Sequence, residues 1–98
     1  MATFYVRSRT GEDEILKSLI IDGINEERKK IEYALSISTA IIREKENSFK
    51  ITSADFLVKF REGRIEENED TFQWWAELKL TDTLKKQLAT LADVEICQ

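Results

Sequence analysis

Apolar residues recur at intervals of three and four along residues 12–47, which is the spacing of one face of an α-helix. Acidic residues open this segment, and Arg43 and Lys45 lie near its end, an order of charges that suits the helix dipole. We therefore predict a helix over residues 12–47. Its stripe runs through Leu16, Ile20, Ile24, Ile31, Ala34, Leu35, Ser38, Ile41 and Ile42.

The predicted helix is long for a chain of 98 residues. At about 1.5 Å per residue it extends roughly 50 Å, whereas a compact domain of this size has a diameter of about 33 Å. Gly23 costs about 1 kcal/mol in a helix interior and is the natural place for a break. Either the helix bends near Gly23, or it projects and packs against another chain.

A short helix is predicted over residues 53–62. Ser53 is a suitable N-cap, and Gly63 stands where a left-handed residue ends a helix. Phe56 and Phe60 lie one turn apart and give this helix an apolar face.

A second long helix is predicted over residues 71–93, with Asp70 as its N-cap. Two long helices with apolar stripes predict a mainly α fold, a long helical hairpin with a short connecting helix, as one domain over residues 1–98. We expect this hairpin to dimerise, closing a bundle. The second stripe contains Phe72, Ala76, Leu80, Leu84, Leu88 and Leu91.

Residues 1–10 are predicted to form a strand or a flexible arm. The run from Thr3 to Arg9 is rich in β-branched and aromatic residues, which favours a strand. A single strand is not stable alone, so it would need a partner strand from a second copy or from another protein.

Composition narrows the function. The chain has no histidine and one cysteine, so it lacks the usual general base, the ligands of a zinc site and an internal disulfide. We predict no enzymatic activity, no catalytic residue, no metal and no cofactor. The net charge of −4 argues against a broad phosphate-binding face. The sequence shows no membrane span and no targeting segment, and we expect a cytoplasmic protein.

The run Glu66, Glu67, Glu69 and Asp70 offers clustered oxygen ligands of the kind that Mg²⁺ or Ca²⁺ binds. Its place at the start of a helix is fully explained by capping and by the helix dipole, so we do not predict a metal site. Carboxylates there also suit the steering of a basic partner.

Trp74 and Trp75 are neighbours, and neighbouring helical positions point about 100° apart. If Trp75 packs into the hairpin core, Trp74 forms a second apolar strip with Leu78, and that strip needs a partner. The alternative is that the helix of Phe56 and Phe60 covers Trp74 within the chain.

Arg7 and Arg9 suggest a second function. A strand followed by a helix, paired across a dimer, is the arrangement of a ribbon–helix–helix protein that places a β-ribbon in the major groove. That fold has two short helices, however, and here the first helix is long.

The order of residues from Ser53 to Ala76 resembles small prokaryotic antitoxins of toxin–antitoxin pairs. The resemblance covers residues 25–96, and the N-terminal segment departs from it. It implies a protein that binds and neutralises a small toxin, such as one that cleaves RNA, by covering its basic active site with an acidic helical surface. The matching residues are Phe56, Phe60, Gly63, Asp70, Phe72 and Trp74, followed by Leu84, Leu88, Leu91, Val94 and Glu95.

The residues and the resemblance together predict a protein-binding protein whose partner is a small basic protein. The alternatives are a dimeric DNA-binding repressor that uses Arg7 and Arg9, and a structural helical homodimer resembling a coiled coil. The predicted contact residues are Trp74, Leu78, Glu66, Glu67, Glu69 and Asp70.

Overall fold

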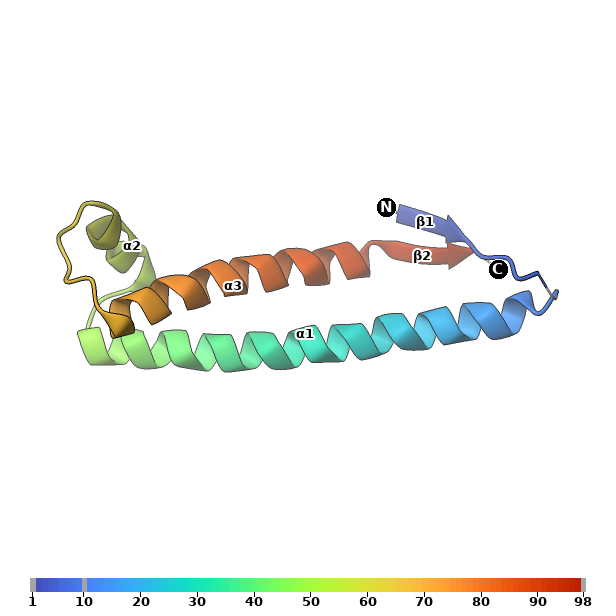
Figure 1. The fold of residues 1–98 in the computed structure, drawn as a ribbon, viewed down its shortest axis with the longest axis horizontal. Coiled ribbons are helices and arrows are strands. Elements are labelled where there is room, and N and C mark those ends of the chain that lie inside the picture. The colour runs from blue at the N-terminus through green and yellow to red at the C-terminus, as the bar shows by residue number, and fades with distance from the viewer. Residues whose placement is uncertain (1, 10, 98) are drawn as a thin grey trace.

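The computed structural model describes residues 2–9 and 11–97, and it has the predicted architecture of a helical hairpin (Figure 1). Met1 and Thr10 lie outside the described residues, so the prediction for residues 1–10 is compared with the structure over residues 2–9. The elements in chain order are β1 (Ala2–Tyr5), α1 (Asp13–Phe49), α2 (Ser53–Arg61), α3 (Glu69–Ala92) and β2 (Val94–Cys97).

α1 is unbroken over its 37 residues, so the bend considered at Gly23 does not occur (Figure 1). The described part of the molecule measures 61 × 20 × 17 Å, with a radius of gyration of 19.4 Å where a compact domain of this length has about 13 Å. The helix projects. This hairpin is a rod, and a rod leaves little volume for a core.

α1 and α3 run side by side in opposite directions, and the centre of their contact is polar (Figure 1). Ser38 is 1% exposed, and its hydroxyl lies 2.6 Å from Glu77 Oε2 and 2.8 Å from Thr81 Oγ1. Ile31 and Leu84 are the buried apolar residues of this long contact among those the structure describes. The Ser38 hydroxyl therefore fixes how α1 and α3 are aligned along their axes, at a place where few apolar contacts could do so.

The N-termini of α2 and α3 are capped by residues other than those predicted. Thr52, rather than Ser53, caps α2, because its hydroxyl accepts from the Asp55 backbone N–H at 3.1 Å. Gly63 has a φ of +69°, which confirms its predicted left-handed conformation.

α3 begins at Glu69, and its N-cap is Asn68 rather than Asp70. Asn68 Oδ1 accepts from the Thr71 backbone N–H at 3.0 Å, and Thr71 Oγ1 accepts from the Asn68 N–H at 2.9 Å. This reciprocal pair satisfies two backbone donors at once, which a lone Asp70 could not do.

The N-terminal strand finds its partner inside the chain. β1 pairs in parallel with β2, from Ala2 opposite Val94 to Tyr5 opposite Cys97. The strand ends at Tyr5, four residues before the predicted end at Arg9. No helix within the described residues combines the length and the apolar character needed to cross a bilayer.

Candidate functional site

Trp74 lies at the centre of the core, at the end of the hairpin that α2 closes. Its side chain is 0% exposed and stacks on Phe56 of α2, with ring centroids 3.9 Å apart and planes 7° apart. Phe49 at the end of α1 also packs against Trp74, with ring centroids 5.3 Å apart. The indole N–H donates to the Ser53 hydroxyl at 3.1 Å.

The structure shows which of the two tryptophans is buried. Trp74 is buried and Trp75 is 39% exposed, so Trp74 forms no exposed strip, and the alternative in which the helix of Phe56 and Phe60 covers Trp74 within the chain is confirmed. The physical reason is the position of α2, which lies over the start of α3 on the side of Trp74 (Figure 1). Trp75 points about 100° away from it and therefore reaches the surface.

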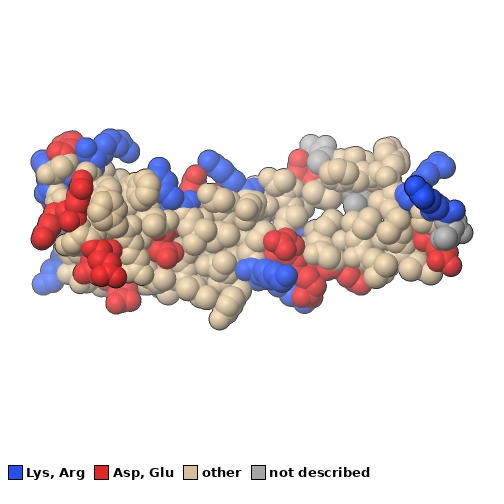
Figure 2. All heavy atoms as spheres, viewed as in Figure 1, with Lys and Arg blue, Asp and Glu red and all other residues tan. Residues whose placement is uncertain are grey.

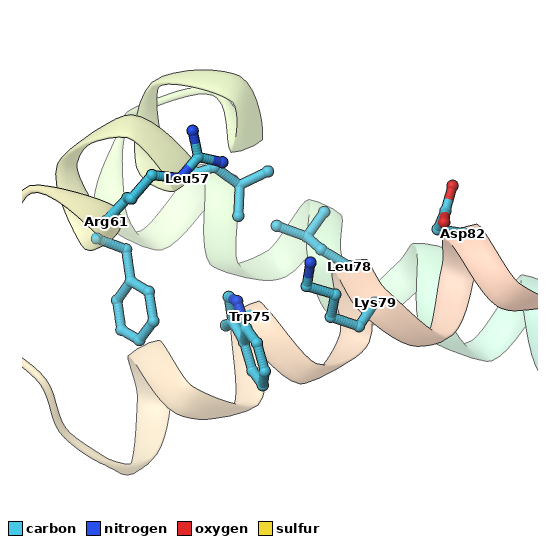
Figure 3. Close-up of a pocket in the computed structure, with 7 residues that line it drawn as sticks. Leu57, Arg61, Trp75, Leu78, Lys79 and Asp82 are labelled. Atoms are coloured by element: carbon cyan, nitrogen blue, oxygen red, sulfur yellow. The ribbon is translucent and has the colours of Figure 1, made fainter.

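Trp75 lines a groove of about 560 Å³ between α2 and α3 (Figure 3). The ring of Trp75 lies 6.5 Å from that of Phe60, and the Lys79 ammonium lies 5.6 Å from the centre of the Trp75 ring. Sequence reasoning assigned Leu78 to the contact surface, and this residue does line the groove. The remaining lining residues are Leu57, Arg61 and Asp82.

This groove is apolar at its floor and charged at its rim. Leu57 and Leu78 face one another from α2 and α3, while Arg61 and Asp82 lie further out (Figure 3). Phe72, next to this region on α3, is 51% exposed and meets the edge of the Phe60 ring. Aromatic surface that remains accessible beside an apolar groove is typical of protein-binding sites.

The four predicted acidic residues lie at the same end of the rod, and all four are exposed. Figure 2 shows acidic side chains gathered at this end, with basic ones around them. Asp70 forms an ion pair with Lys45 of α1 at 3.1 Å, so part of its charge serves to hold the two helices together. Glu66 and Glu67 lie in the loop before α3, and Glu69 begins the helix.

The structure does not bring the acidic run into the groove itself. Glu66, Glu67, Glu69 and Asp70 are absent from its lining, and the nearest charges there are Arg61, Lys79 and Asp82. Among the described residues no three carboxylates or thiols gather in a way that could hold a metal ion.

Arg7 and Arg9 are exposed and follow β1 instead of lying in it. A ribbon–helix–helix protein reads DNA from side chains on the strand, and its two strands come from different chains and run antiparallel. Here β1 pairs in parallel within one chain, so the geometry of that fold is not present in this hairpin.

Phe60 and Trp75 are the aromatic groove residues that were not predicted as contacts, and the other lining residues that were not predicted are Leu57, Arg61, Lys79 and Asp82. The sequence does show an aromatic residue on each of two neighbouring helices, Phe60 on α2 and Trp75 on α3. Which of the two tryptophans faces outward, however, depends on where α2 lies. Comparisons of the chain with models of known families, with curated proteins and with solved structures found no match.

Proposed function

We propose that this chain is a non-enzymatic protein-binding module of the antitoxin kind, which neutralises a small basic toxin in the cytoplasm. The observation that carries the proposal is the groove between α2 and α3, with an accessible tryptophan at its side. Trp75 and Leu78 serve as apolar anchors for a partner side chain. Interface energy is usually concentrated in a few such anchors.

The acidic run contributes by steering. Glu66, Glu67 and Glu69 are exposed at the same end of the rod as the groove, and a field of this sign accelerates the encounter with a basic protein. Asp70 belongs to this set by position, but its ion pair with Lys45 reduces the charge it offers. The contact set we propose is therefore Trp75, Leu78, Glu66, Glu67, Glu69 and Asp70.

Copurification from the native host tests the proposal. The expected result is a stoichiometric small basic protein that is toxic when it is expressed alone and harmless when it is expressed with this chain. Recovery of this chain without such a partner, under conditions in which the partner gene is expressed, would contradict the proposal.

A substitution of Trp75 tests whether the groove is the contact. Trp75→Ala should weaken binding of that partner by about 30-fold, the equivalent of a hot spot of about 2 kcal/mol, while the chain keeps its helical circular dichroism and its cooperative unfolding. A folded Trp75→Ala variant that binds as tightly as the parent would show that the groove is not the contact.

The charge contribution has a separate readout. Replacing Glu66, Glu67 and Glu69 together by Gln should slow association and reduce its dependence on salt, with little change in the dissociation rate. An effect confined to the dissociation rate would place these carboxylates inside the contact instead of beside it.

A further inference from the structure

A flank of α1 outside its contact with α3 carries its own row of residues, which we call the outer stripe. At about 100° per residue its members fall within an arc of roughly 60°, well away from the buried residues Ile31 and Ser38 on the same helix. The outer stripe consists of Ile15, Leu19, Glu26, Lys30, Tyr33 and Ile37.

Four large side chains of the outer stripe are exposed. Ile15 is 58% exposed, Leu19 63%, Tyr33 70% and Ile37 45%. Single exposed apolar residues are normal on a protein surface, but a row of them on one helix face is typical of an interaction site. This row lies on α1, apart from the groove between α2 and α3.

A residue of α3 adds to the apolar surface of the outer stripe. Ser38 and Thr81 are in contact across the helices at 2.8 Å. Ile37 and Leu80 each precede one of these residues, and in antiparallel helices a backward step of one residue turns both side chains to the same flank. Leu80 is 44% exposed, so it extends the apolar surface beside Ile37.

The order of residues along the outer stripe is self-complementary. From its start the stripe reads apolar, acidic, basic and apolar again. Leu19 and Ile37 lie at equal distances on either side of position 28, and so do Glu26 and Lys30. An antiparallel copy centred there would set Leu19 against the partner's Ile37 and Glu26 against the partner's Lys30.

A parallel copy would not have this match. It would place Glu26 beside the partner's Glu26 and Lys30 beside the partner's Lys30, and like charges held close are unfavourable. Within its own chain Glu26 has an exposed contact with Lys29 at 3.4 Å, an arrangement that contributes little and leaves the carboxylate accessible.

The accessible area supports a second copy as the occupant. The chain has 7294 Å² of accessible surface, whereas a compact monomer of 11.4 kDa has about 5,800 Å². The excess is about 1,500 Å², and a standard interface buries about 800 Å² on each partner. We propose that the outer stripe is the interface of an antiparallel homodimer, centred near position 28 of α1.

Light scattering on the purified full chain tests the association. The expected mass is twice 11.4 kDa. A mass of one chain at micromolar and higher concentrations would overturn the proposal.

Substitutions test the surface. Leu19→Lys and Ile37→Lys should each raise the dimer dissociation constant at least 10-fold, with unchanged helical circular dichroism. Thr39→Lys is the matched control, because Thr39 is exposed on the same helix but on another side, and this variant should remain dimeric. A dimer that survives both stripe substitutions would have a different interface, which overturns the proposal.

Charge and crosslinking test the orientation. Glu26→Lys and Lys30→Glu should each weaken the dimer, and the double variant should restore it, because an antiparallel pair exchanges both contacts. In a Cys97→Ser background, a short bis-maleimide should link Leu19→Cys chains to Ile37→Cys chains. It should not link Leu19→Cys chains to one another, since antiparallel copies hold those positions about 27 Å apart. Linkage among Leu19→Cys chains alone would show a parallel dimer and overturn the proposed arrangement.

This dimer is independent of the groove. Trp75→Ala should leave the mass at two chains, and Ile37→Lys should leave the groove intact. Loss of one property without the other therefore distinguishes a failure of the dimer from a failure of the proposed function.

Discussion

Trp74 contacts residues of both other helices at the end of the rod that α2 closes. It joins three helices: it extends from α3, stacks on Phe56 of α2 and contacts Phe49 at the end of α1. Its one polar atom is satisfied by Ser53, so burial of the indole leaves no donor unpaired. Trp75, one residue later, contributes surface instead of core.

This contrast gives a stability prediction. Trp74→Ala should lower the free energy of unfolding by about 3–5 kcal/mol, because it leaves a large cavity among packed rings. Trp75→Ala should cost about 1 kcal/mol. Urea titration followed by circular dichroism measures both changes. Equal losses would contradict the assignment of one residue to the core and the other to the surface.

The sequence could establish that the two tryptophans point in different directions, but not which one is buried. Helical periodicity fixes the angle between neighbours. The choice depends on α2, whose Phe56 lies 18 positions away and is placed by the turn after Lys50 and the cap at Thr52. That information is not local to Trp74.

At the scale of elements, α1 tolerates a glycine in its interior. A methyl group added at Gly23 would meet no atom within 4 Å in the chain. Gly23→Ala should therefore raise the free energy of unfolding by about 0.5–1 kcal/mol, since alanine has the higher helix propensity and a less flexible unfolded state. Thermal melting measures the gain. A loss of stability would mean that the backbone at Gly23 is closely approached.

The Ser38 hydroxyl is the buried polar group at the centre of the contact between α1 and α3. Ser38→Ala should cost about 1.5–3 kcal/mol, because it removes the hydrogen bond to the half-buried Glu77 carboxylate. Ser36→Ala is the control, since the Ser36 hydroxyl is exposed and bonds only to the Tyr33 carbonyl of its own helix. Chemical denaturation of the two variants should differ clearly. Similar small effects would show that water replaces the Ser38 bond without cost.

The long helices α1 and α3 were predictable because each carries a stripe over many turns, and errors of one or two residues average out along such a length. The exact ends of the helices were less predictable. Ser53 and Asp70 are good N-caps by residue type, but Thr52 and Asn68 are the N-caps in the structure. Asn68 has the advantage that it forms a reciprocal pair of hydrogen bonds with Thr71. β2 was not predicted, since its four residues follow a helix directly and its partner β1 lies at the other end of the chain.

At the scale of the whole molecule, burial is uneven. Phe56, Thr71 and Trp74 are all 0% exposed, and all three lie at the end that α2 closes. Toward the other end, Lys17 is the buried residue nearest the start of α1 within the described part, and its ammonium lies 3.8 Å from Glu14. One end of the rod therefore has a core, and the other has little.

Hydrogen exchange should follow this gradient in the Ile37→Lys variant, in which no second copy covers the outer stripe of α1. Amides of α2 and the first half of α3 should exchange slowly, through global unfolding, whereas those of residues 13–24 should exchange through local opening. Mass spectrometry of peptides after timed labelling measures the difference. Uniform protection along α1 would contradict it and would indicate that its first turns are covered.

The parallel pairing of β1 and β2 has a mechanical consequence. Tension applied through residues 2 and 97 acts along the strands in opposite directions, so it loads the ladder between Ala2–Tyr5 and Val94–Cys97 in shear. In shear all the hydrogen bonds carry the load together, whereas antiparallel strands pulled from adjacent ends would open one bond at a time. The small sheet then acts as a latch across the open end of the rod, and single-molecule stretching should show a force peak that is lost when Val94 is replaced by proline.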